Sequence, residues 1–416
     1  MKDVLPGETP AWQYVESCVV DILQSYGYQE IRTPILEQTE LFKRGIGEAT
    51  DVVEKEMYTF DDRDGSSITL RPEGTASCVR ACEQHQMLFD RGNLTQKLWY
   101  TGPMFRHEKP QKGRLRQFHQ FGVEAFGYAG PDIDAEMLIM TARLWKALGI
   151  DAHLELHINS LGTSESRAVY REALVAYFES HFDKLDEDSQ RRLHTNPLRI
   201  FDSKVASTRE LLDGAPRMDD YLDEASRSDF EQLKAILDDV GVRYVVDSTL
   251  VRGLDYYSKT VFEWITHKLG AQGTVCGGGR YDNLVPLLGG KPTSAIGFGI
   301  GIERLVLLLG ELDCIPMEIF QTLDVYVIAA GVPASEALKL GEFLRESQPA
   351  LRVQVHCGGG SFKSQMKKAD RSGAIVGLII GEDEIANDSV TVKFLREERE
   401  QVTVAREQLI SILNQE

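Results

Sequence analysis

The 416-residue sequence has no pair of cysteines at C-x-x-C spacing, and its six cysteines form no Cys/His group with the spacing of a metal site. It has no apolar run long enough to cross a bilayer, and its N-terminal residues contain no signal-peptide core. These absences argue against a disulfide scaffold, a structural zinc protein and a membrane span. We therefore expect free thiols in a cytoplasmic protein without a membrane partner.

Positive charge is also scarce, because the formal net charge is −18. A field of this sign repels phosphates, so any contact with nucleic acid has to be local. Basic residues concentrate in residues 106–116, where five of them stand against one glutamate, and in residues 363–371. With 42% hydrophobic and 26% charged residues, the composition is that of an ordinary globular protein with two or three domains.

The stretch of residues 295–305 predicts a strand that continues into a helix. Side chains alternate along a strand, so one face of it is left bare by Gly297, Gly299 and Gly301. Arg304 follows at the start of the helix, and the G-x-G-x-G spacing is a poor fit to a dinucleotide fingerprint. Two interpretations stay open: close packing of another element on the bare face, or a purine base lying beneath the guanidinium.

Residues 10–26 predict an amphipathic opening helix that ends at Gly27. The extended segment that follows, residues 27–37, contains Pro34, which a strand tolerates only at an edge or an interface. This part of the chain is either plain scaffold or the seam of a dimer.

A strand at residues 68–71 leads through a turn to a helix that begins near Thr75. Glu73 and Thr75 therefore lie at the end of a sheet. Loops in such places present polar groups to substrates, and they also cap helices. The residue types alone leave both roles open.

Two strands are predicted at residues 97–108 and 118–127, joined by the basic loop. Gln120 and Glu124 share one face of the second strand with Gly122. A glutamine and a glutamate beside a glycine gap are typical of the polar floor of a pocket. A basic loop by itself is usually a solvated tip, but this combination predicts a functional hairpin.

The residues from about 161 to 247 are rich in polar helices and predict a helical insertion. Strand patterning resumes over residues 250–264, in which Arg252 and Asp255 are costly to bury without partners. A glycine turn is predicted at residues 277–282. We interpret this region as the lining of a polar cavity.

After a linker at residues 317–322, residues 323–416 predict a separate small α/β domain. Its second helix, residues 361–372, carries a basic stripe on one face. The stripe consists of Lys363, Lys367 and Arg371. Three apolar residues of this helix are predicted to face inward: Phe362, Met366 and Ala369. The stripe is either a solvated face or an RNA contact, and the glycine turn ahead of it favours RNA.

Three segments together resemble motifs 1, 2 and 3 of class II aminoacyl-tRNA synthetases, in the correct order. They are Gly-Tyr-x-x-Ile-x-x-Pro after the first helix, Phe-Arg-His-Glu at residues 105–108, and Gly-Phe-Gly-Ile-Gly-Ile-Glu-Arg at residues 297–304. Residues 250–257 (LVRGLDYY) and 278–282 (GGRYD) resemble the two histidine motifs of the histidyl-tRNA synthetase family, in its bacterial form. With residues 71–75 and the C-terminal domain, the resemblance covers essentially the whole chain.

The resemblance implies an α+β catalytic domain, residues 1–316, built on an antiparallel sheet flanked by helices (the class II synthetase fold) and carrying the helical insertion. It implies a small C-terminal anticodon-binding domain with a mixed α/β sheet, residues 323–416, and a homodimer. One departure concerns the N-terminus, where family members usually carry a short strand with Arg-Gly ahead of Asp-x-Leu-Pro. Here Met1 and Lys2 directly precede Asp3. We expect this difference to weaken the dimer seam and to leave the site residues in place.

The implied reaction is the ATP-dependent ligation of L-histidine to histidine tRNA through histidyl-adenylate, with release of AMP and pyrophosphate. ATP is a substrate, Mg²⁺ enters bound to it, and no metal is held by a dedicated protein site. By resemblance Arg106, Arg252 and Arg304 are catalytic, because fixed cations stabilise the charge of a phosphoryl centre. The implied ATP site comprises Arg106, Glu108, Arg114, Gly297, Gly299, Gly301 and Arg304.

The implied histidine pocket comprises Glu73, Thr75, Gln120, Glu124, Tyr256, Tyr257 and Tyr281. Neutral imidazole has one donor and one acceptor, so a carboxylate and a tyrosine hydroxyl can read both of its nitrogens. The residues implied for tRNA are Gln111, Arg116, Lys363, Lys367 and Arg371. Two alternatives remain: a non-catalytic, histidine-sensing paralogue that regulates ATP phosphoribosyltransferase, and a related class II synthetase for another amino acid.

Overall fold

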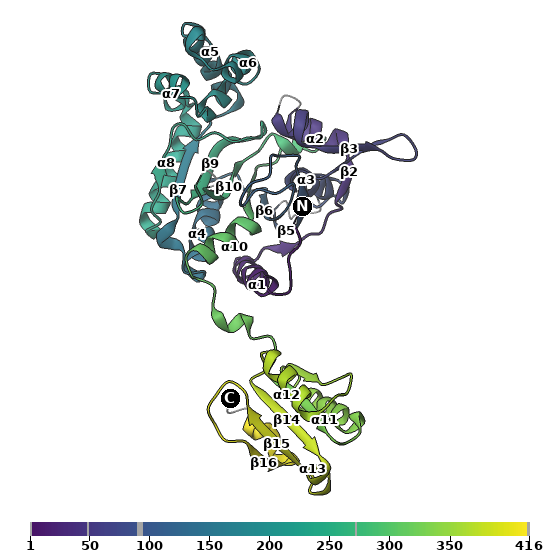
Figure 1. The fold of residues 1–416 in the computed structure, drawn as a ribbon. Helices are drawn as coiled ribbons and strands as arrows, with labels where there is room; N and C mark the ends of the chain where they lie inside the picture. Colours follow the sequence, from purple (N-terminus) through teal and green to yellow (C-terminus); the bar gives the residue numbers. More distant parts are fainter. Residues whose placement is uncertain (1, 48–49, 90–94, 271–272, 414–416) are drawn as a thin grey trace. The chain divides into compact units, whose positions relative to one another are not determined.

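The computed structural model describes residues 2–47, 50–89, 95–270 and 273–413 (Figure 1). The chain separates into two compact units, and the boundary between them in the sequence falls after Ile315. Met1 and the last three residues of the predicted C-terminal domain lie outside the described residues. Among the described residues, no helix is long and apolar enough to cross a membrane.

The first unit is built on an eight-stranded sheet in the order β1-β5-β6-β11-β10-β9-β7-β8. Neighbouring strands are antiparallel except at the two edges, where β1 runs parallel to β5 and β8 parallel to β7. The strands are β1 (Gln29–Glu30), β5 (Gln96–Phe105), β6 (Gln117–Phe126), β7 (Glu155–Ser160), β8 (Val245–Val246), β9 (Ser258–Ile265), β10 (Thr274–Arg280) and β11 (Ala295–Gly301). The antiparallel sheet predicted for this domain is confirmed.

Four helices cover one face of this sheet. They are α1 (Thr9–Ser25), α4 (Pro131–Ala147), α8 (Glu224–Val240) and α10 (Ile302–Glu311). Odd-numbered residues of β6, such as Phe121 and Val123, pack against them in one apolar core together with Phe298 and Ile300 of β11. The period of two along β6 and β11 therefore buries one face and leaves the other to polar residues and glycines.

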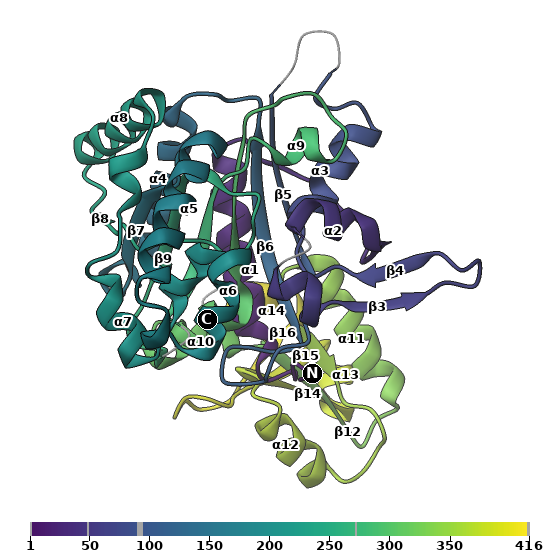
Figure 2. The ribbon, with the colours of Figure 1, turned by 90° about the horizontal axis from the view of Figure 1, so that it is seen from above.

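A smaller layer lies on the opposite face. It contains α2 (Thr39–Ile46), α3 (Thr75–Gln84), α9 (Leu284–Leu287), a π-helical turn (Val52–Glu56) and a three-stranded sheet of β2 (Leu36–Gln38), β4 (Ser67–Leu70) and β3 (Tyr58–Asp61). Figure 2 shows β3 and β4 as a hairpin that projects from this unit. The predicted helix at residues 10–26 and the helix starting at Thr75 are confirmed, whereas residues 31–35 form no regular strand.

Residues 250–257 were predicted to continue a strand, and this prediction is wrong. The strand β9 begins only at Ser258, and the preceding residues form loops and turns. Arg252 and Asp255 reach partners on β9 and on a neighbouring helical segment, Glu263 and Asn196. A regular strand with alternating faces does not satisfy both charged groups in this way.

The glycine turn predicted at residues 277–282 is also wrong in part, because Gly277, Gly278 and Gly279 lie inside β10. A Cβ on Gly278 would lie 2.1 Å from the backbone oxygen of Gly297, and one on Gly279 would lie 2.5 Å from that of Thr260. The register shifts between Gly279 and Arg280. These glycines permit close approach of neighbouring strands, which is the other common reason for glycine in a strand.

The region predicted as a helical insertion has two parts. It contains α5 (Ser164–Glu179), α6 (Glu187–Thr195), α7 (Ala206–Leu212) and short 3-10 turns at Phe182–Lys184, Pro197–Asp202 and Met218–Tyr221, and a further turn at Asp151–His153 precedes it. Apolar residues from Tyr170 to Met218 form a core of their own. Helix α8, by contrast, contributes Phe230, Leu233 and Leu237 to the main core beside α4. The part with a separate core is thus shorter than residues 161–247.

The second unit has a five-stranded mixed sheet in the order β13-β12-β14-β15-β16. Its elements are β12 (Val325–Ala330), α11 (Ala334–Ser347), β13 (Val353–Val355), α12 (Phe362–Arg371), β14 (Val376–Gly381), α13 (Glu382–Ala386), β15 (Ser389–Phe394), β16 (Val402–Ala405) and α14 (Leu409–Leu413), with 3-10 turns at Met317–Phe320 and Arg406–Gln408. The three parallel strands β13, β12 and β14 confirm the predicted βαβ pattern.

Helix α12 differs from the prediction in one residue. Ala369 is fully buried and Met366 packs against the same core, but Phe362 is 47% exposed. Gln365 takes the inward position instead, donating to the backbone oxygen of Ala329 at 2.9 Å. Phe362 is the first residue of the helix, so it lies at the end of the element, where the helical period no longer constrains a side chain to the core.

Candidate active site

A cavity of about 320 Å³ opens on the face of the large sheet that the four helices leave uncovered. Gly122, Gly299 and Gly277 are direct neighbours in register on β6, β11 and β10. Paired residues of adjacent strands point to the same face, so these positions form one row without side chains. The row makes a depression across the middle of the sheet.

Polar side chains lie over this row. A Cβ on Gly299 would meet Gln120 Nε2 at 2.2 Å, and a Cβ on Gly277 would meet Arg252 Nη1 at 2.7 Å. A Cβ on Gly301, at the end of the same strand, would have its nearest atoms 4.0 Å away, on Arg304. The predicted bare face is therefore real, and the residues predicted for ligand binding lie along it.

Glu124 on β6 forms the centre of the inner half of the site. It is 1% exposed, and its Oε1 accepts hydrogen bonds of 2.8 Å from the hydroxyls of Thr75 and Tyr100. Tyr281 donates its hydroxyl to Oε2. A Cβ on Gly297 would lie 1.7 Å from the same Oε2. Glycine at position 297 thus makes room for the glutamate.

Burial raises the pKa of Glu124 to about 8, although the three hydroxyl donors act in the opposite direction. Removing a carboxylate from water costs more than these hydrogen bonds return. A buried, hydrogen-bonded acid of this kind, located next to a cavity, is typical of binding sites.

Glu73 has a structural role that is visible in its contacts. Its two oxygens accept the backbone N–H groups of Thr75 at 2.7 Å and of Ala76 at 2.9 Å, at the start of α3. Burial raises its pKa despite these bonds. Glu73 therefore caps the helix that presents Thr75 to Glu124, while it also lines the cavity.

Three tyrosines form an aromatic wall. The ring centroids of Tyr256 and Tyr281 are 5.7 Å apart in an edge-to-face arrangement, and those of Tyr256 and Tyr257 are 4.7 Å apart. The guanidinium of Arg252 lies over the ring of Tyr257, 5.5 Å from its centroid. This contact joins the tyrosine wall to the cationic half of the site.

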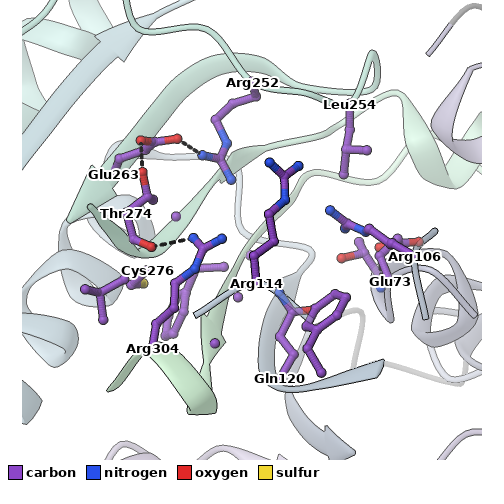
Figure 3. A pocket seen from close by; sticks show the side chains of 18 of the residues that line it. Glu73, Arg106, Arg114, Gln120, Arg252, Leu254, Glu263, Thr274, Cys276 and Arg304 are labelled. Carbon is purple, nitrogen blue, oxygen red and sulfur yellow. Dashed lines mark hydrogen bonds and ion pairs between the residues drawn. The ribbon is translucent and has the colours of Figure 1, made fainter. Parts of the chain in front are cut away.

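The cationic half contains a continuous chain of hydrogen bonds, drawn in Figure 3. Arg252 pairs with Glu263, and Thr274 donates its hydroxyl to the other oxygen of Glu263 at 2.8 Å. The backbone oxygen of Thr274 accepts a 2.7 Å hydrogen bond from Arg304. Two arginines that are far apart in the sequence are thereby fixed relative to each other.

Arg304 is held from a second side by the backbone oxygen of Gly113, at 3.1 Å. Burial lowers its pKa, and the charges of Arg114 and Arg106 lower it further. Arg106, Arg114 and Arg304 all line this cavity, and an anion bound there would relieve their mutual repulsion.

The loop after β5 supplies the opposite wall. Arg106 donates to the backbone oxygen of Pro72 at 2.8 Å and lies over the ring of Phe118, 5.5 Å from its centroid. Glu108 pairs with Arg114, which extends into the space between the other arginines (Figure 3). The loop thus contributes Arg106, Glu108 and Arg114 to the cavity, while its tip, residues 109–112, is exposed.

The acidic groups at the cavity all have partners in the protein. Glu108 and Glu263 pair with arginines, Glu73 caps α3, and Glu303 accepts the backbone N–H of His119 at 2.9 Å. Among the described residues no group of three or more His, Cys, Asp or Glu has the geometry of a metal site. An incoming phosphate would compete with Glu108 and Glu263 for the guanidinium groups.

The cavity brings together most of the predicted site residues. All seven predicted for ATP line it, as do Arg252 and six of the seven predicted for histidine: Glu73, Thr75, Gln120, Tyr256, Tyr257 and Tyr281. Glu124 is not in its lining and lies behind Thr75, Tyr281 and Gly297. Of the residues predicted for tRNA, Gln111 and Arg116 belong to the loop after β5, and the basic stripe on α12 belongs to the second unit.

Three residues of the site were not predicted as such. Tyr100 donates to Glu124, and its ring fills the space that a side chain on Gly122 would need, 2.1 Å from the ideal Cβ. Glu263 positions Arg252, and Glu303 holds the backbone of the strand that carries Gln120. For Glu263 the sequence offered a signal, because this residue stands among the apolar residues 261–265 and a charged residue in such a run requires a partner.

Comparison with known proteins gives the following. Residues 1–305 match the family model of histidyl-tRNA synthetase, and residues 324–416 match that of an anticodon binding domain. The structure resembles that of an apo histidyl-tRNA synthetase from S. aureus, with 40% identity, a TM-score of 0.82 and coverage of 99% of this chain and 98% of that chain.

Two more distant structures share the fold. A histidyl-tRNA synthetase from Nostoc sp. PCC 7120 is 21% identical, with a TM-score of 0.71 and coverage of 100% of this chain and 98% of that chain. A protein from Bacillus halodurans, described as an ATP phosphoribosyltransferase regulatory subunit/histidyl-tRNA synthetase, is 20% identical, with a TM-score of 0.62 and coverage of 92% and 96%.

Proposed function

The chain belongs to the histidyl-tRNA synthetase family, and from this premise we propose how its cavity divides between histidine and ATP. Family membership makes it an enzyme that ligates histidine to tRNA with consumption of ATP. The observation that carries the division is the polarity of the cavity. Hydroxyl groups around Glu124 lie at one end, and four arginines converge at the other.

ATP is proposed to lie over β11, with its phosphates among the arginines. Gly299 and Gly301 leave a flat floor for adenine, and Arg304 is fixed beside it by Gly113 and Thr274. Arg106 and Arg252 would contact the α-phosphate from opposite walls of the cavity. Their positive charges stabilise the added charge at phosphorus when the histidine carboxylate attacks and pyrophosphate leaves.

The imidazole of histidine is proposed to occupy the inner end, beside the aromatic wall. Tyr281 connects the cavity to Glu124, so the two together offer a hydroxyl and, behind it, an acid to the ring nitrogens. Thr75 and Gln120 would receive the ammonium group. An apolar amino acid would leave these buried polar groups unpaired, which is the physical basis of the selectivity.

Mg²⁺ is proposed to enter with the nucleotide. The carboxylates at the cavity already hold arginines or backbone N–H groups, so they suit a metal that the phosphates bring better than one that the protein holds. When bound, it would withdraw charge from the phosphate oxygens.

The second unit is proposed to bind the anticodon arm, with residues 1–316 as the catalytic domain and 317–322 as the linker. The match of residues 324–416 to an anticodon binding domain supports this division. Gln111 and Arg116 in the loop after β5 would meet the acceptor end of the tRNA. The stripe of Lys363, Lys367 and Arg371 is exposed and available to phosphates.

A homodimer is proposed from the apolar surface near the N-terminal segments. Ile35, Leu36 and Phe60 are 40%, 46% and 46% exposed, and Leu36 and Phe60 belong to the same three-stranded sheet. Sedimentation of Phe60→Glu should then show a loss of dimer relative to the parent protein, while an unchanged mass would argue against this surface. We propose a cytoplasmic location, because charged tRNA is used in translation there.

The activity is tested by histidine-dependent exchange of pyrophosphate into ATP. Purified full-length protein should support exchange with histidine and not with glycine or proline. Exchange without dependence on histidine would refute the assignment of the inner pocket. Charging of histidine tRNA, measured alongside, reports on both units.

A further inference from the structure

A second cavity, of about 290 Å³, lies between the helices of the insertion and the loop before β9. Its ionisable lining consists of Arg167, Arg171, Arg199, Arg252 and Asp255. Four positive charges stand against one negative charge in the lining, and two of the four also have carboxylate partners outside it: Arg199 with Asp51, at 3.8 Å, and Arg252 with Glu263. Such a local excess of arginine is a feature of anion sites.

Two arginines of α5 line this cavity, and their hydrogen-bond partners are uncharged backbone oxygens. Arg171 donates to the backbone oxygens of His194 and Thr195, at 2.7 and 3.3 Å, and Arg167 donates to that of Tyr257. Within the described part of the chain, neither forms an ion pair with a carboxylate. Neutral partners therefore position both guanidinium groups, while the nearby charge of Asp255 acts on them without a direct ion pair.

The one acidic group in the lining, Asp255, has a hydrogen-bond partner of its own. Asp255 accepts a hydrogen bond of 3.0 Å from Asn196, and burial raises its pKa. Its backbone N–H donates a hydrogen bond to the backbone oxygen of Ile46, and this contact fixes the loop in place. Asp255 thus joins the insertion to the catalytic unit, and the charges of Arg167, Arg199 and Arg171 oppose the effect of burial on its pKa.

The two cavities are separated by a single stretch of loop. Arg252 and Leu254 line both of them, and Figure 3 shows the two residues on the same segment at the rim of the active site. A group bound in the second cavity would therefore lie next to the arginine that is proposed to contact the α-phosphate.

We propose that the second cavity is a phosphate-binding site distinct from the triphosphate site. This inference rests on the proposed function, because the reaction both releases pyrophosphate and brings the phosphodiesters of the tRNA 3′ end to the active site. Planar guanidinium forks match phosphate oxygens, whatever the source of the phosphate. The site would hold one of these groups while the other steps proceed.

Binding is tested with inorganic pyrophosphate as the probe, by calorimetry on the full-length protein. Saturating histidine and a nonhydrolysable ATP analogue first fill the active site. Pyrophosphate should still bind, with about one site per chain, and Arg171→Gln and Arg199→Gln should each weaken this binding roughly tenfold, as expected for a charge-assisted hydrogen bond. Absence of binding under these conditions would show that pyrophosphate uses the ATP site only, and would overturn the proposal.

Arg191→Gln serves as the matched control. It removes the same charge from the insertion, but Arg191 is exposed and pairs with Asp188 outside the cavity. Pyrophosphate binding by this variant should stay within about twofold of the parent protein. Arg171→Lys should recover part of the lost binding, which a general disturbance of α5 would not allow, and melting temperatures check that each variant is folded.

Kinetics then separate the two sources of phosphate. If the site holds the product, both variants raise the KM for pyrophosphate in the exchange reaction, roughly tenfold, and leave the KM for tRNA unchanged. If it holds the 3′ end, the KM for tRNA rises instead. If neither KM changes, the site has no part in the reaction and the proposal is wrong. A parent protein without any exchange would refute the proposed function, while the calorimetry would still report on the cavity.

Discussion

Replacing Gly297 by alanine should damage histidine binding more than any other change of this size on β11. The added Cβ would lie 1.7 Å from Glu124 Oε2 and 2.7 Å from the backbone oxygen of Val123. The carboxylate would have to move by more than about 1 Å, since real Cβ atoms essentially never approach closer than 3.0 Å. The backbone oxygen can move only with the strand.

The carboxylate of Glu124 has nowhere to move without losing partners. It is 1% exposed and held by Thr75, Tyr100 and Tyr281. A buried hydrogen bond that is left unmade costs roughly 1–3 kcal/mol, which corresponds to an increase of about fivefold to 150-fold in the KM for histidine. The KM for ATP should change much less, because the arginine end of the cavity is not displaced.

Two other substitutions on the same strand provide the controls. Gly299→Ala would meet the end of the flexible Gln120 side chain at 2.2 Å, so a smaller increase is expected. Gly301→Ala has its nearest atoms at 4.0 Å and should leave the KM for histidine unchanged. Exchange kinetics at varied histidine and fixed ATP measure this order. A KM for histidine in Gly297→Ala that is no higher than in Gly301→Ala, in a folded protein, would refute the reasoning.

Arg252→Ala should slow histidine-dependent exchange by at least about a hundredfold at saturating substrates, because a fixed cation at the transition state is removed; an effect on KM alone would contradict its role. Burial holds the pKa of Glu124 near 8, well above its ordinary value of 4.5. Between these values the folded protein keeps a proton that the unfolded chain has released. The free energy of unfolding should therefore fall as pH rises from about 5 to 8, by up to roughly 5 kcal/mol. Glu124→Gln should abolish this term, so its melting temperature relative to the parent should rise over that range, and a pH-independent difference would count against it. Reversing the charge of Lys363 and Lys367 should raise the KM for tRNA and leave exchange intact. Lys339→Glu, at an exposed position of α11, is the control, and an equal effect there would show a general field effect instead.

Local patterns predicted much of the fold because they depend on neighbours in the sequence. The alternation in residues 295–301 and the helical period from Ile302 are both present as β11 and α10. The hairpin of β5 and β6 was likewise recognisable from its apolar and polar faces. These elements have one dominant period, so the solvent-facing and core-facing sides are fixed before any tertiary contact forms.

The same reasoning failed where glycine and charge depend on distant partners. Gly277 and its neighbours were predicted as a turn, yet they lie in β10, because Gly297 and Thr260 approach from adjacent strands. Residues 250–257 were predicted as a strand, yet they form a loop, and from this loop the side chain of Arg252 pairs with Glu263 on β9. A sequence window contains no information on which strand will lie opposite, so it cannot distinguish a turn glycine from a close-packed one.

The sequence by itself determined the family resemblance, the order of the elements and the residue types at the site. Tertiary structure alone decided how they meet. It aligned Gly122, Gly299 and Gly277 in one row, and it placed Glu124 behind the wall of the pocket instead of in its lining. The glycine-faced strand therefore serves both ends of the cavity, since Gly297 makes room for Glu124 and Gly301 lies beside Arg304. Register between distant strands sets these contacts, and register results from packing of the whole sheet.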